Sequence, residues 1–268
     1  MKARLSAAIL ILCVSALGCG GKDDDDTEDM PAAVKEVFDA AELGNPEAQF
    51  TLGNMYYSGE GVAQDLPEAV NWMFKAAEQG HAGAEYQYGL YLANGEGIER
   101  NLTQAMQWWK QAADKGHMNA QFQLAAALSI DRGVEPDYAA AAEWYRLAAE
   151  QGHEQAQLEV ASLYQKGKGV PQDYEQAVQW YTKAADQGNA LAAFTLGLMY
   201  GDGAGVEQDN AEAYQWLSIA SLRASAEDEE KYVAARTAVA ARLNPFQIAD
   251  RDKRVQQWVE AFAKRAQQ

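Results

Sequence analysis

Residues 75–98 read KAAEQGHAGAEYQYGLYLANGEGI, and altered copies follow at residues 111–134 (QAADKGHMNAQFQLAAALSIDRGV) and 146–170 (RLAAEQGHEQAQLEVASLYQKGKGV). The copies keep one fixed period. Aliphatic residues stand 36 positions apart along the chain, at Val62, Ile98, Val134, Val170 and Val206. A fixed period of roughly 20–50 residues is typical of a solenoid, in which each unit packs against its neighbours.

Each unit contains two helical patterns separated by glycine. Apolar residues recur at helical spacing from Pro46 until Gly59, and a second run from Leu66 ends at Gly80. A short polar residue precedes the second run, where its side chain can accept hydrogen bonds from free backbone N–H groups. These residues are Asp65, Asn101, Asp137, Asp173 and Asp209. The pattern predicts an all-α chain of five 36-residue helix-turn-helix hairpins.

The consensus of the units, A..LG.MY..G.GV.QD...A..W..KAA.QG, resembles the Sel1-like repeat family, which is related to the tetratricopeptide repeat. Residues 48–80 and 192–216 match most closely, and five units cover residues 45–222. The third unit departs from the pattern, with Ala125 and Asp131 in place of glycines, and the last unit lacks the terminal glycine. The resemblance implies a right-handed α/α superhelical solenoid that acts as a scaffold for protein contacts.

The two ends of the stack are atypical, as expected for units that cover an exposed core. Residues 31–44 align with a second helix alone, so they predict an N-terminal capping helix. Residues 223–268 predict two C-terminal capping helices, the second with Asn244 as its cap and Pro245 in its first turn. The mildly basic tail is expected to be a solvated face; a site for an acidic partner is the alternative.

The N-terminus has the layout of a secretory signal peptide, with Lys2 and Arg4 before an apolar run that is too short to span a bilayer. Residues 16–19, ALGC, resemble a bacterial lipobox. That resemblance implies cleavage after residue 18, lipidation of Cys19, and, because Gly20 follows, an outer-membrane location facing the periplasm. An ordinary cleaved signal is the alternative. Residues 19–30 are acidic and predict a solvated tether, with a calcium site as a weaker reading.

Composition excludes several kinds of function. The formal net charge is −17, and no basic stripe with aromatic residues is present, so nucleic acid is not an expected partner. Both cysteines, Cys13 and Cys19, lie within the first 19 residues, so the predicted solenoid has no disulfide or thiolate site.

Tryptophan also recurs every 36 residues, which would suit sugar stacking or an aromatic cage. The preferred interpretation is structural, because each indole lies on the alanine-rich stripe where neighbouring helices approach. We expect Trp144→Ala to cost about 3–5 kcal/mol of stability. The five residues are Trp72, Trp108, Trp144, Trp180 and Trp216.

The remaining candidate chemistry is weak. His81, His117 and His153 recur at the same step, but equivalent positions of stacked hairpins lie about 10 Å or more apart, too far to share a metal. Asn45 and Asn189 occupy the same slot, so these are turn residues. The Gly-x-Gly loops follow helices and are not phosphate loops. We expect no metal, no cofactor and no nucleophile–base pair, although an active site built from carboxylates alone stays open.

One helix face changes from copy to copy and is the predicted partner-binding surface. In such stacks the first helices line the concave side, where extended segments bind. We call this surface the first-helix face; it consists of Thr51, Asn54, Gln87, Leu90, Gln123, Ala126, Glu159, Ser162, Thr195 and Leu198.

The sequence thus favours a non-enzymatic, lipid-anchored cell-envelope adaptor that binds a protein or peptide. Two alternatives stay open. Some secreted members of the family are linked to beta-lactam binding or hydrolysis, but those have a disulfide in each repeat and this chain has none. A cell-wall glycan binder is the other alternative, which the fixed tryptophan positions disfavour.

Overall fold

The computed structural model describes residues 31–130 and 135–265, and within these ranges the chain forms thirteen helices and no strands. The first helices of the five hairpins are α2 (Pro46–Ser58), α4 (Ala82–Asn94), α6 (Met118–Leu128), α8 (Glu154–Lys166) and α10 (Ala190–Asp202). The second helices are α3 (Leu66–Glu78), α5 (Leu102–Asp114), α7 (Tyr138–Glu150), α9 (Tyr174–Asp186) and α11 (Asn210–Arg223). The capping helices are α1 (Ala32–Glu42), α12 (Glu229–Ala240) and α13 (Pro245–Arg265).

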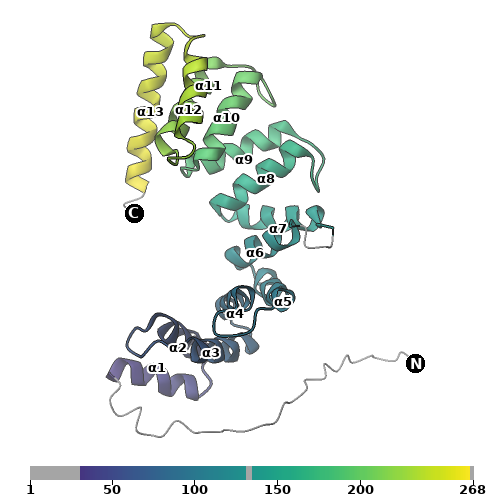
Figure 1. The fold of residues 1–268 in the computed structure, drawn as a ribbon, viewed down its shortest axis with the longest axis vertical. Coiled ribbons are helices and arrows are strands. Elements are labelled where there is room, and N and C mark those ends of the chain that lie inside the picture. Colours follow the sequence, from purple (N-terminus) through teal and green to yellow (C-terminus); the bar gives the residue numbers. More distant parts are fainter. Residues whose placement is uncertain (1–30, 131–134, 266–268) are drawn as a thin grey trace, which may run out of the picture.

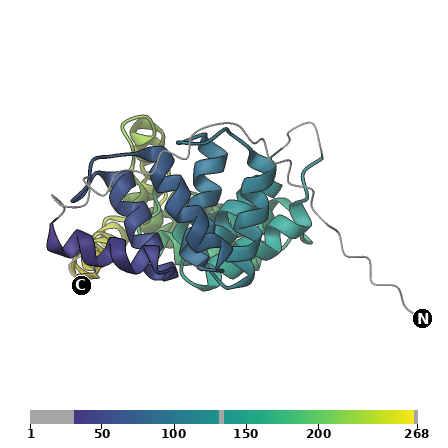
Figure 2. The ribbon, with the colours of Figure 1, turned by 90° about the horizontal axis from the view of Figure 1, so that it is seen from below.

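The hairpins stack in chain order into a curved solenoid. Each first helix packs against the second helix of its own hairpin, and each second helix packs against the next first helix. Figure 1 shows the resulting arc, in which α5 and α7 lie on one side and the two ends, α1 and α13, lie on the other. The view from below agrees with this arrangement (Figure 2). The prediction of an all-α repeat solenoid is confirmed.

The predicted caps start the second helices. The side-chain oxygen of Asp65 accepts a hydrogen bond from the backbone N–H of Glu68 at 3.0 Å, and that of Asp173 accepts one from Gln176 at 2.9 Å. Asn101, Asp137 and Asp209 cap their helices in the same way. At the end of α2, Gly59 has a φ of +77°, the left-handed conformation that glycine adopts without strain.

Alanines form the centre of the core and let neighbouring helices approach closely. The tryptophans around them are not equivalent: Trp72, Trp180 and Trp216 are buried, whereas Trp108 and Trp144 are only half-buried. In the second and third repeats the following residue takes the inner position, namely Trp109 or Tyr145. We therefore lower the expected cost of Trp144→Ala, because its ring keeps part of its contact with water.

Trp109 takes its inner position because the facing residue is Gly89. The indole Nε1 of Trp109 donates a hydrogen bond to the carbonyl oxygen of Tyr86 at 3.2 Å. A Cβ at Gly89 would lie 2.5 Å from that same nitrogen, which is closer than van der Waals contact allows. The third repeat has Ala125 in the slot of Gly89, and there the inner ring is the smaller Tyr145.

In four of the five hairpins, a buried polar side chain of the first helix is bonded to a residue at the end of the second helix; the fifth has Ala193 at this position. In the first repeat, the side-chain amide of the buried Gln49 donates to the carbonyl oxygen of Ala41 and accepts at 2.7 Å from Gln79, which follows the second helix. The third and fourth repeats have the same pair of glutamines. The second repeat replaces both partners. There the buried residue is Glu85, and the Nζ of Lys115 lies 2.5 Å from its Oε1. The change from amide to carboxylate is thus matched by a change from amide to cation.

The C-terminal helices close the stack in different ways. Helix α12 packs on α11, where a sixth repeat would place its first helix. Its Tyr232 stacks on Phe194 with ring centroids 4.4 Å apart. Asn244 caps α13, accepting from the N–H of Gln247 at 2.9 Å, as predicted. Helix α13 then packs back along α11, and near its end Arg265 donates to the carbonyl oxygen of Asp186 at 2.8 Å.

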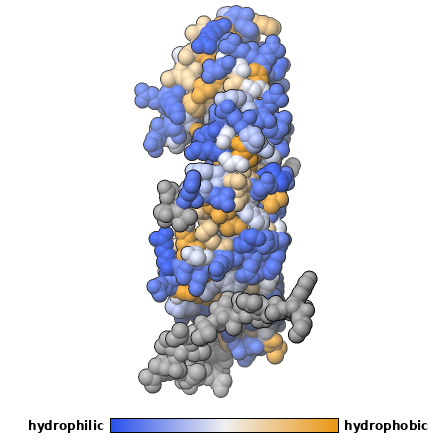
Figure 3. Space-filling model, turned by 90° about the vertical axis from the view of Figure 1, so that its right-hand side faces the viewer, coloured by the Kyte–Doolittle hydropathy of each residue, from blue (hydrophilic) through white to orange (hydrophobic). Residues whose placement is uncertain are grey.

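On the right-hand side of the arc, hydrophobic side chains gather in patches down the middle and hydrophilic side chains surround them (Figure 3). None of the helices in the described part of the chain has both the length and the apolar character needed to cross a bilayer. The predicted signal peptide, Cys19, the tether at residues 19–30, and Asp131 and Val134 lie outside the described residues.

Candidate functional site

The ten residues of the first-helix face lie on α2, α4, α6, α8 and α10, outside the buried core. Asn54 and Leu198 are exposed and the other eight are half-buried. Three of the ten, Glu159, Ser162 and Thr195, line one hollow between α8 and α10. The seven others line neither this hollow nor the smaller one between α7 and α8.

This hollow has a volume of about 330 Å³, and we call it the repeat 4–5 hollow. Helix α8 supplies five of its lining residues, α9 supplies one from below, and α10 supplies two. They are Leu158, Glu159, Ser162, Gln165, Lys166, Tyr181, Leu191 and Thr195. The lining therefore combines two aliphatic side chains with one carboxylate, one ammonium group and several neutral polar groups.

The three preceding junctions are filled by an aromatic–histidine stack. An aromatic ring on each first helix packs flat on the histidine that begins the next first helix. The ring centroids lie 4.6 Å apart for Phe50 and His81, 4.8 Å for Tyr86 and His117, and 4.3 Å for Phe122 and His153. At the fourth junction the two positions hold Leu158 and Asn189, so neither ring is present. Of these two residues, Leu158 lines the repeat 4–5 hollow and Asn189 does not.

The histidines also cap helices, which explains why asparagine shares their slot. The Nδ1 of His81 accepts from the backbone N–H of Ala84 at 3.1 Å, and His117 and His153 bond in the same way. Asn189 accepts from the N–H of Ala192 through its amide oxygen at 2.9 Å. The interpretation of these histidines as turn residues is confirmed. Within residues 31–130 and 135–265, no group of three or more His, Cys, Asp or Glu side chains could hold a metal ion.

Glu159 dominates the electrostatics of the hollow. Its Oε1 accepts a hydrogen bond from Gln155 at 3.1 Å, and it forms no ion pair with any residue in the described ranges. Burial, and after it the charge of Glu159, raise the pKa of Tyr181 to about 12. The phenol of Tyr181 therefore stays protonated and donates to the Oε1 of Gln165 at 2.7 Å. This end of the hollow is negative and well supplied with hydrogen-bond acceptors.

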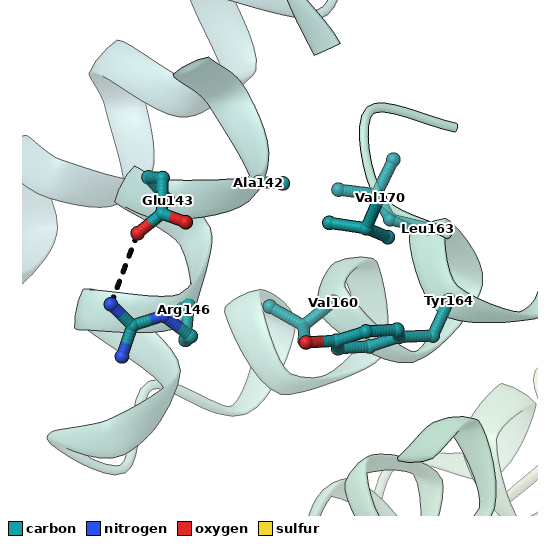
Figure 4. A pocket seen from close by; sticks show the side chains of 7 residues that line it. All are labelled: Ala142, Glu143, Arg146, Val160, Leu163, Tyr164 and Val170. Carbon is teal, nitrogen blue, oxygen red and sulfur yellow. Dashed lines mark hydrogen bonds and ion pairs between the residues drawn. The ribbon is translucent and has the colours of Figure 1, made fainter. Parts of the chain in front are cut away.

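A second, smaller hollow of about 60 Å³ lies between α7 and α8. Figure 4 shows Glu143 and Arg146 of α7 on one side, joined by an ion pair of 3.0 Å, and aliphatic and aromatic side chains opposite them. The opposite wall is formed by Val160, Leu163, Tyr164 and Val170. Its volume suits a few water molecules but not a side chain of a partner.

Sequence reasoning missed both the repeat 4–5 hollow and Tyr181. The signal was present, because the aromatic residue and the histidine change together: Phe50, Tyr86 and Phe122 each have a histidine 31 positions later, whereas Leu158 has Asn189. Comparing these two positions across the repeats shows that the junction between the fourth and fifth repeats lacks both rings. The contribution of Tyr181 could not be predicted in this way, since it belongs to the second helix α9 and not to the first helices whose residues were compared.

Comparisons with known proteins agree with the geometry. A family model described as Sel1 repeat matches residues 46–81, 82–117, 119–153, 154–189 and 190–225. The structure of a Sel1 repeat protein from Oxalobacter formigenes is similar, with 30% identity, a TM-score of 0.66, and coverage of 73% of this chain and 86% of that chain. No curated protein matches the chain.

A second similar structure is that of a protective antigen present in uropathogenic Escherichia coli strains, which displays an SLR fold. It is 27% identical with a TM-score of 0.56, and the match covers 87% of this chain but 57% of the antigen. The chain thus spans little more than half the length of this relative.

Proposed function

The chain belongs to the Sel1 repeat family, and on that premise we propose that it is a non-enzymatic scaffold of the cell envelope that binds a protein or peptide on its first-helix face. The Sel1 repeat fold generally mediates protein–protein interaction, and its members are typically non-catalytic. The observation that carries the proposal is the repeat 4–5 hollow, because three residues chosen for their variation between repeats line the same depression.

The described residues offer little for catalysis. Each of the three histidines uses Nδ1 to cap a helix, and the hydroxyls of Thr51 and Thr195 donate back to their own helices at 2.9 Å. A nucleophile needs a base within hydrogen-bond reach. In these residues, Nδ1 of each histidine and the two hydroxyls are occupied with their own backbone, and Nε2 of His81 lies 2.9 Å from the carboxylate of Glu47. The same surface is well suited to recognition, since half-buried polar side chains can bond to an extended segment.

The proposed location rests on the N-terminal sequence, in which Cys19 is the acceptor of the lipid. We expect metabolic labelling with a palmitate analogue to mark the native protein, and Cys19→Ser to remove the label and release the protein from the membrane fraction. A Cys19→Ser protein that is still labelled and membrane-bound would overturn the anchor.

Affinity capture from gently solubilised membranes tests the binding role. The test variant carries Gln123→Ala and Glu159→Arg on the first-helix face. The control variant, Glu260→Arg, makes the same charge change at an exposed position of α13. A partner recovered with the native and control proteins but lost with the test variant, at equal thermal stability, is the expected result. Identical recovery from all three proteins would contradict the proposal.

A further inference from the structure

The repeat 4–5 hollow differs from the rest of the first-helix face because its junction lacks the aromatic–histidine stack. The closest centroid distance in the three filled junctions is 4.3 Å, so those rings leave no space between them. At the fourth junction the side chain of Asn189 instead donates to Glu154 at 2.8 Å. The hollow thus lies at the junction where the aromatic ring and the histidine are both replaced.

The size of the hollow suits one long side chain. Small-ligand sites span about 300–1,000 Å³, so 330 Å³ lies at the lower end of that range. Leu191 stands on the rim and is 47% exposed, while Leu158 forms part of the wall. The alkyl part of an entering lysine or arginine side chain would cover Leu191 while its charged end stays hydrogen-bonded.

The charge at the Glu159 end of the hollow selects the sign of a side chain that enters there. Glu159 has no cationic partner among the described residues, and the protonated phenol of Tyr181 lies close enough to be affected by its charge. Lys166 lies seven residues further along α8, about 10 Å away at 1.5 Å per residue, so the two charges mark opposite ends of the hollow. A basic side chain that reaches the Glu159 end would complete an ion pair there, whereas an acidic one would be repelled from that end and attracted at the opposite end, by Lys166.

The geometry points to the repeat 4–5 hollow as the pocket for a lysine or arginine side chain of an extended segment of the partner protein, with Glu159 as its counterion. This inference rests on the proposed scaffold function and adds the chemistry of the segment that is bound. Charge-assisted hydrogen bonds are stronger than those between neutral groups, so a preference of about tenfold or more for a basic residue is expected.

The test measures binding of four fluorescently labelled pentapeptides, acetyl-Ala-Ala-Xaa-Ala-Ala-amide, whose central residue is Arg, Lys, Ala or Glu. Anisotropy titrations use the full-length protein in detergent. We expect the Arg and Lys peptides to bind about tenfold more tightly than the other two. Glu159→Gln should remove that preference, and the matched exposed variant Glu260→Gln should keep it, which separates the pocket from the general negative charge of the chain.

A second variant enlarges a side chain in the wall of the hollow without changing the charge of the lining. Leu158→Phe with Asn189→His restores the pair found at the other three junctions, and thermal unfolding checks that it folds. We expect this variant to lose the preference for basic peptides. Equal binding of all four peptides by the native protein, or a preference that survives either pocket variant, would overturn the inference.

The pocket and the scaffold function can fail separately. If partner capture depends on the first-helix face while the four peptides bind equally, the scaffold function stands and the pocket inference is wrong. If the preference for basic peptides depends on Glu159 while capture is unaffected by the face variant, the pocket inference stands and the proposed function is wrong.

Discussion

Removing the cation of the buried pair in the second repeat should destabilise the protein more than any single change to a surface ion pair. The side chain of Glu85 is 1% exposed, and its Oε2 has no hydrogen-bond partner. Lys115→Met keeps most of the alkyl stem but removes the ammonium group, which is the partner of Oε1. The variant leaves a buried carboxylate without a counterion.

The magnitude follows from two considerations. Breaking a buried ion pair by removing one partner costs about 3–5 kcal/mol. Lys115 is 41% exposed, so water partly replaces the lost ammonium group and lowers the penalty. We expect a loss of about 2–4 kcal/mol, which corresponds to a melting temperature lower by roughly 5–15 °C.

Two further variants make the measurement specific. Lys110→Met removes the cation of an exposed pair with Asp114 on the same helix, and should cost about 0.5 kcal/mol or less. Glu85→Gln with Lys115→Gln recreates the glutamine pair of the first, third and fourth repeats, and should lie within about 1 kcal/mol of the native protein.

Thermal and urea unfolding by circular dichroism measure the stability of these four proteins, and hydrogen exchange of the α4 amides locates the effect. Hydrogen exchange is needed because repeat proteins can unfold in parts. The reasoning is refuted if Lys115→Met is as stable as Lys110→Met, or if the double variant loses as much stability as Lys115→Met.

Three other outcomes are expected. Gly89→Ala should lower the free energy of unfolding by about 1–3 kcal/mol, because the added methyl group would overlap the indole of Trp109. In the control Gly201→Ala, the added Cβ lies no closer than 3.8 Å to another atom, so this variant should be neutral or stabilising in chemical denaturation. Burial lowers the pKa of His117 and His153 below the ordinary 6.5. Their contribution to stability is therefore complete above pH 6.5 and decreases as the pH falls below it. Replacing both with Asn should make the melting temperature depend less on pH between pH 7 and 5.5. Trp180→Ala, at a 7% exposed position, should cost about 3–5 kcal/mol by urea denaturation, and a shift near zero would contradict the core assignment.

The solenoid was predictable because its signals are periodic and local. The repeat shows as a spacing of 36 residues along the chain. Glycines at helix ends and short polar caps such as Asp65 act on the backbone within a few residues, so the sequence alone indicates where each helix begins and ends. The asparagine at position 244 and the proline after it marked the start of α13 for the same reason.

Burial within the stack was less predictable, since it depends on which of two adjacent large residues takes the inner position. Trp108 and Trp109 are neighbours in the sequence, and the inner ring of Trp109 fits because Gly89 on the facing helix leaves room for it. The packing of α13 against α11 could not be predicted either, because α13 lies outside the 36-residue repeat and the repeat pattern does not say where it packs.

That packing affects how the protein opens. Solenoids tend to fray from their ends, because a terminal unit has a neighbour on one side only. Here the contact between Arg265 and Asp186 spans 79 residues and joins the last helix to the fourth repeat. Detachment of the fifth repeat also requires the release of α13, whereas α1, an 11-residue helix, packs on α2 and, through Phe38, on Trp72 of α3, both in the repeat next to it. We therefore expect fraying, and with it proteolytic cleavage, to start at the N-terminal end of the stack.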